Sequence, residues 1–174
     1  MKIESPAFTL DDVKGFMDTY LDRERNILAD RLQSVSDRIV ALAPRVKAEP
    51  SDEAEWNAHE LLAHVAVLSK FYGVMVHRIA TGKLPNMDLL QAVNLRDDAG
   101  KKMSELDPGE LARMIATDHE RTIAALRSTD SMDLRRAAEL GDGITMTAED
   151  VARLPLISHL ELHVEQLERL LERS

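Results

Sequence analysis

Cysteine is absent from the sequence of 174 residues. This absence excludes disulfide bonds, thiolate metal ligands and a cysteine nucleophile, and it agrees with a reducing compartment. We therefore expect a cytoplasmic protein in which any thiol chemistry uses the thiol of a substrate.

Aromatic residues, glycine and proline are scarce. The chain has one Trp, two Tyr, three Phe, seven Gly and six Pro, although 44% of its residues are hydrophobic. An apolar set made mostly of Leu, Ala, Val, Ile and Met favours packed helices over sheet. The length is typical of one domain. We therefore predict a single all-α domain over residues 1–174 with almost no strand.

Positive charge is also in short supply. The chain has 22 Lys and Arg against 31 Asp and Glu, a formal net charge of −9. A phosphate backbone would meet mostly like charge, so we expect no nucleic-acid partner. Residues 1–15 lack the apolar core of a secretion signal, and no apolar run is long enough to span a membrane. We therefore expect no membrane partner.

Apolar residues recur at three- and four-residue spacing in four long segments. This pattern predicts an antiparallel four-helix bundle with short additional helices in the connections. Ser51, Asp107 and Thr147 are predicted helix caps. Because Pro155 removes one backbone hydrogen bond, a kink or a new helix start is expected just before His159. The long helices are predicted at residues 10–42, 51–80, 108–128 and from 148 onward, and the short ones at residues 88–95 and 131–140.

Two histidines interrupt the leucine-rich stripe of the last segment. His159 and His163 are four residues apart, so a helix places both rings on one face. A buried imidazole without a partner loses hydration, and shared coordination of a divalent metal removes that penalty. A metal site needs a further ligand, and His64 on the second predicted helix has apolar neighbours. We predict a metal site formed by His64, His159 and His163.

Other polar residues leave alternatives open. His119 is the rival third ligand because it falls close to the apolar stripe of the third predicted helix, whereas His77 lies at a different phase from His64. Glu60 and Asn57 precede His64 by one and two turns, so either could support a ligand, face a substrate or belong to a solvated ridge. The sequence assigns no catalytic residue.

Two known metal motifs are excluded by spacing. His59 and His64 flank Glu60, but three residues follow that glutamate where the zinc-protease motif has two. The Glu-x-x-His repeat of di-iron bundles is missing as well, because no acidic residue stands three positions before any histidine. A ferritin-like site is therefore not expected.

Over residues 10–172 the sequence resembles the DinB-like superfamily. The resemblance rests on the segment from Trp56 to His64 and on His159, His163 and Gln166, the last followed by an aliphatic residue. The chain departs from the pattern at Glu165, where a glycine is common. It also departs at residues 160–162, where members often carry basic residues or histidines.

The resemblance implies a divalent metal, zinc or nickel, held by the three imidazoles. For some members it also implies transfer or isomerisation chemistry with a low-molecular-weight thiol. Our leading hypothesis is therefore a metal-dependent thiol S-transferase or hydrolase that acts on a small electrophile, with Gln166 as a further supporting residue. The alternative is a non-catalytic metal-binding or dimerising bundle. A homodimer is suggested by the resemblance and by surplus apolar positions on the second and third predicted helices.

Overall fold

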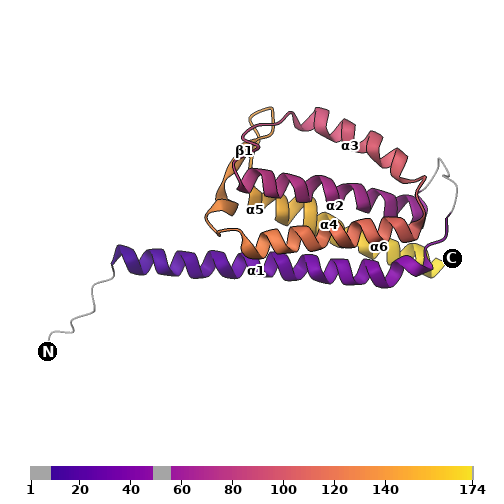
Figure 1. The fold of residues 1–174 in the computed structure, drawn as a ribbon, viewed down its shortest axis with the longest axis horizontal. Coiled ribbons are helices and arrows are strands. Elements are labelled where there is room, and N and C mark those ends of the chain that lie inside the picture. The colour runs from indigo at the N-terminus through magenta and orange to yellow at the C-terminus, as the bar shows by residue number, and fades with distance from the viewer. Residues whose placement is uncertain (1–8, 49–55, 174) are drawn as a thin grey trace.

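The computed structural model describes residues 9–48 and 56–173. Four rods form a bundle, as Figure 1 shows. A further helix, α3 (Leu89–Met103), joins the second rod to the third. The all-α bundle with an additional helix in a connection is therefore confirmed. The rods are α1 (Leu10–Leu42), α2 (Ala58–Ala80), α4 (Pro108–Ser128) and a C-terminal rod made of α5 (Ala148–Val151), a π-helical segment (Ala152–Ser158) and α6 (His159–Arg173).

Helix α2 is the most enclosed rod of the bundle. It packs against α3, α4 and α6, while α1 packs against α4 and α6. Leu61 and Leu68 of α2 are completely buried. Most apolar positions of this helix are thus used inside the chain, and Val74 is left exposed.

Helix α3 decides the direction of the later rods, because it carries the chain back along the bundle (Figure 1). As a result, α2 and α4 run in the same direction. His59 Nε2 donates to the Leu106 carbonyl at 2.8 Å, and further along both helices Ser69 pairs with His119 at 2.8 Å. The α2 and α6 rods run antiparallel, which brings the start of one to the end of the other.

The start of α2 is fixed by a capping box. The Asn57 side chain accepts from the Glu60 backbone N–H at 2.9 Å, and the Glu60 carboxylate accepts from the Asn57 N–H at 3.1 Å. Such reciprocal bonds satisfy two backbone donors that a helix start leaves unpaired. The predicted cap Ser51 lies outside the described residues. The capping box places His64 in the second turn of α2.

The predicted helix over residues 131–140 is wrong. A 3-10 turn, Asp133–Arg135, is followed by strand β1 (Ala137–Glu139), which pairs antiparallel with β2 (Thr145–Thr147). Gly141, Asp142 and Gly143 all have positive φ, at 89°, 51° and 74°. Two glycines beside an Asp tolerate this left-handed path, so the chain reverses and the backbone groups pair across the turn.

The C-terminal rod changes its winding around Pro155, which lies inside the π-helical segment. Because proline has no backbone N–H, the regular hydrogen-bond ladder cannot pass through it. Regular α-helix begins at His159, the new start that the sequence predicts. The predicted cap Thr147 holds the other end of the rod and accepts from the Asp150 N–H at 3.0 Å. Among the described helices, none is long and apolar enough to cross a membrane.

Candidate metal centre

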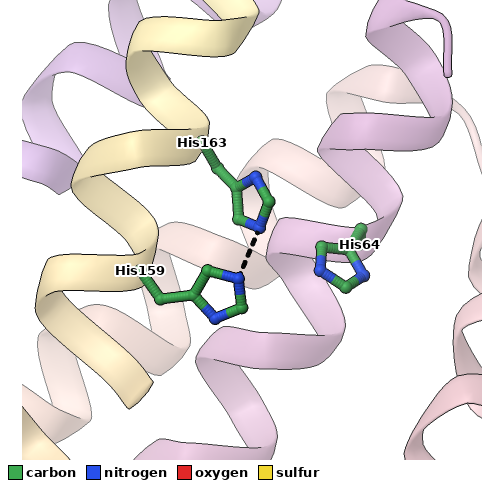
Figure 2. Close-up of side chains that lie close together, drawn as sticks. All are labelled: His64, His159 and His163. Carbon is green, nitrogen blue, oxygen red and sulfur yellow. Dashed lines mark hydrogen bonds between the residues drawn. The ribbon is translucent and has the colours of Figure 1, made fainter. Parts of the chain in front are cut away.

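His64 of α2 and the pair His159 and His163 of α6 point toward one another, as Figure 2 shows. One ring nitrogen from each lies within 4.8 Å of the others. The His159 Nε2 and His163 Nε2 atoms are 3.0 Å apart. The ring centroid of His64 lies 4.9 Å from that of His163 and 6.1 Å from that of His159. Within the described ranges, these three residues form a group with the spacing of metal ligands.

The outer nitrogens of the α6 pair are occupied by acceptors. His163 Nδ1 donates to Gln166 Oε1 at 3.3 Å. The ring of His159 hydrogen-bonds the backbone of Pro155, which offers only a carbonyl, so His159 donates there. Its Nε2 faces His163, and Nδ1 is therefore the donor (Figure 2). Two Nε2 lone pairs then face each other, an arrangement that a shared cation stabilises.

Burial keeps these imidazoles neutral at neutral pH. The pKa of His64 is lowered to about 4, chiefly by loss of hydration and also by the neighbouring His163. Burial is also the largest cause of the lowered pKa values of His159 and His163. Because a divalent metal binds neutral imidazole, the ligand nitrogens need not first lose a proton at neutral pH.

The donor set fits a divalent cation. Zinc–nitrogen bonds of about 2.0–2.1 Å in a tetrahedral site separate neighbouring nitrogens by about 3.3 Å. The 3.0 Å between the two α6 nitrogens is close to that value. Among the described residues no fourth protein ligand joins the three imidazoles. Catalytic zinc sites have three protein ligands and keep the fourth position open for water or a substrate.

The predicted supporting residues lie in different places. Gln166 accepts a hydrogen bond from Nδ1 of His163, one of the three candidate ligands. Asn57 and Glu60 hydrogen-bond each other as the cap of α2. Glu60 also lines the cleft beside His64. Of the three, Gln166 is therefore the one placed to orient an imidazole.

The remaining histidines lie away from the group. His119, the rival ligand, is buried between α4 and α2, where its Nε2 pairs with Ser69 Oγ. His77 is exposed near the end of α2, and His59 is held by the Leu106 carbonyl. The geometry thus favours His64 over His119 as the residue that faces the α6 pair.

A cleft of about 470 Å³ opens beside His64 between α2 and α3. Trp56 lines this cleft, and its ring centroid lies 4.7 Å from that of His64. The α3 side contributes Arg96, a charged residue that the sequence analysis did not single out. Its positive charge lowers the pKa values of His64 and His159. The sequence predicts a short helix over residues 88–95, whereas α3 continues to Met103. Arg96 lies just beyond the predicted range, and the sequence gives no sign of which face of this helix meets α2.

The fold and the site together place the chain among helical bundles in which histidines from two helices converge on one point. The family model of the DinB superfamily matches residues 20–167, and the chain belongs to this superfamily.

A solved structure described as the crystal structure of the mycothiol-dependent maleylpyruvate isomerase is similar to the chain. The two share a TM-score of 0.63 and 20% identity over 84% of this chain. The chain covers 60% of the isomerase, so it spans less than two thirds of that protein. At this identity the likeness shows a shared fold. A search of curated proteins finds no match.

Proposed function

We propose that the chain is a divalent-metal-dependent enzyme of the thiol S-transferase or hydrolase type, with His64, His159 and His163 as metal ligands. The observation that carries this proposal is the convergence of three half-buried imidazoles from two helices beside an open cleft. Zinc or nickel suits such nitrogen ligands. Membership of the superfamily supports the same assignment.

The residues around the centre have distinct tasks in this proposal. His64, His159 and His163 would hold a divalent cation, which as a Lewis acid would lower the pKa of a bound thiol or water toward about 7. Gln166 and the Pro155 carbonyl hold the two α6 rings in the tautomer that turns Nε2 inward. Trp56 narrows the approach to His64, and the cleft admits a small electrophile.

A low-molecular-weight thiol is the proposed co-substrate. The similar structure is described as mycothiol-dependent, and this chain has no cysteine that could serve as the nucleophile. A cytoplasmic location, where such thiols stay reduced, remains a prediction.

Cobalt substitution tests whether the centre can accept a thiol. Metal-free protein loaded with one equivalent of Co²⁺ is expected to change its visible absorption when 2-mercaptoethanol is added, because the open position exchanges. The His64→Ala variant should lose this response, and His77→Ala, which removes an exposed histidine of the same helix, should keep it. A cobalt spectrum indifferent to the thiol would favour the non-catalytic alternative.

We also propose a homodimer that forms through the N-terminal half of α1. This half extends beyond the bundle (Figure 1) and carries exposed Leu10, Met17 and Tyr20. Two copies paired antiparallel around Met17 would bury these side chains and bring Asp11 of each near Arg23 of the other.

Light scattering after size-exclusion chromatography tests the dimer. The wild-type chain should have twice the monomer mass of 19.5 kDa, and Met17→Glu should have the monomer mass. Val40→Glu changes an exposed apolar residue in the C-terminal half of the same helix, away from the proposed interface. This variant should remain dimeric. A monomeric wild-type chain at high concentration contradicts the proposal.

A further inference from the structure

An apolar groove lies between α2 and α3, next to the cleft of the candidate centre. It has a volume of about 440 Å³, within the usual range for sites that hold small organic ligands. On the α2 side it is lined by Phe71, Val74 and Met75, and on the α3 side by Leu95 and Met103. Val74 and Leu95 are 50% and 66% exposed. The groove therefore presents apolar surface to water.

Helix α3, which forms one wall of this groove, packs only loosely against the bundle. Although it packs against α2, none of its residues is buried. Methionines contribute to the lining from α2, from α3 and from the connection between them. Because methionine side chains are unbranched and flexible, they adapt to ligands of different shape.

The charged residues of the lining are all cations. Lys70, Arg78 and Arg96 line the groove, and within the described part of the chain no acidic side chain does so. This bias contrasts with the net charge of −9 for the whole chain. Lys70 and Arg78 take part in none of the ion pairs found between described residues. Their charge is therefore available to an anion from solution.

Arg96 is hydrogen-bonded where the groove meets the cleft. Its side chain is 12% exposed, and it donates to Asp97 at 2.7 and 3.0 Å and to the Tyr72 hydroxyl at 3.1 Å. These contacts use three of its five N–H groups and leave two as donors. Val67 and Arg96 line both the groove and the cleft that contains His64. A ligand in the groove would thus end beside the candidate centre.

We propose that the α2–α3 groove binds the apolar chain or ring of a small organic carboxylic acid, whose carboxylate pairs with the cations of the rim. As a statement about the substrate of the metal centre, this assignment rests on the proposed function. As a binding site it can be measured without any metal.

Calorimetry on the metal-free, full-length protein tests the groove with octanoate as the probe. Octanoate should bind one molecule per chain, about tenfold more tightly than 1-octanol because of the rim cations, and acetate should not bind. Replacing Lys70 or Arg78 with Gln should weaken octanoate binding by about threefold and leave 1-octanol binding unchanged. Equal affinity of wild-type protein for octanoate and 1-octanol would overturn the assignment of the anion.

A matched pair of variants on α3 locates the probe. Leu95→Glu places a carboxylate in the groove and should weaken octanoate binding by about tenfold or more. Leu90→Glu changes a residue of the same helix that is 70% exposed and lies outside the lining, and it should bind as the wild type does. Equal binding by both variants would overturn the groove site.

The two proposals fail separately. Octanoate binding without stoichiometric metal uptake would retain the groove and reject the metal enzyme. Metal uptake with a thiol response but no octanoate binding would retain the metal enzyme and reject the groove.

Discussion

Replacing His163 with Ala is expected to reduce zinc affinity by more than about 100-fold. Losing a residue that only hydrogen-bonds a metal ligand typically costs up to about that much, and His163 is proposed as a ligand itself. The reason is that His163 is central to the group. Its Nε2 lies 3.0 Å from that of His159, and its ring is 4.9 Å from that of His64. Competition against a chromophoric chelator measures the affinity, and circular dichroism checks that the variant is folded.

The supporting residues provide a graded series for the same measurement. Gln166→Leu should weaken zinc binding by about 10- to 100-fold because His163 loses the acceptor that orients its ring. Asn57→Ala should instead cost about 1 kcal/mol of stability through the lost cap and leave zinc affinity nearly unchanged. His77→Ala is the neutral control. If His163→Ala still bound zinc as the wild type does, the assigned ligand set would be wrong.

Acid is expected to destabilise the fold through His119. This side chain is almost completely buried, and burial lowers its pKa to about 4. Ser69 Oγ donates to the Val65 carbonyl at 2.7 Å and therefore accepts from His119 Nε2 at 2.8 Å. His119 Nδ1 is buried without a hydrogen-bond partner. A second proton would thus place an unpaired charge in the interior.

The direction of the pH effect follows from proton linkage. The imidazole has a pKa near 6.5 when unfolded and about 4 when folded, so between these values the unfolded chain binds more protons. Stability is therefore full above about pH 6.5 and falls as the pH drops toward 4. The loss attributable to His119 is on the order of 3 kcal/mol.

Comparison with His119→Leu isolates this contribution. Urea unfolding at pH 7 and pH 4, with a chelator present to exclude metal release, should show a smaller pH dependence for the variant by on the order of 3 kcal/mol. His77→Leu, at an exposed position, should behave as the wild type does. Parallel stability curves for His119→Leu and the wild type would contradict the prediction.

Local chemistry accounts for the parts of the fold that the sequence predicts well. The long helices follow from apolar spacing, and the caps at Asp107 and Thr147 follow from side chains that accept backbone N–H groups. Where a tertiary contact competes with local preference, prediction fails. Residues 137–139 have helix-forming side chains, yet they pair with β2 because the turn at residues 141–143 brings the two segments together.

For the candidate centre too, one part follows from local sequence and another part depends on how the helices pack. The four-residue spacing of His159 and His163 requires the two rings to share one face, because a helix turns through nearly a full circle over that distance. Position in the sequence alone left His64 and His119 as rivals. The packing of α2 against α6 turns His64 toward the pair, whereas His119 of α4 pairs with Ser69.

The sequence by itself determined the all-α class, the rods, the absence of thiol ligands and the pairing of two imidazoles on one helix. These properties depend on residue type and on contacts between near neighbours. Only the tertiary structure decided which third histidine joins the pair, where α3 lies and which charges meet beside the centre. Those outcomes depend on how separate helices pack, and the relative rotation of two rods is set by the whole core and not by either segment alone.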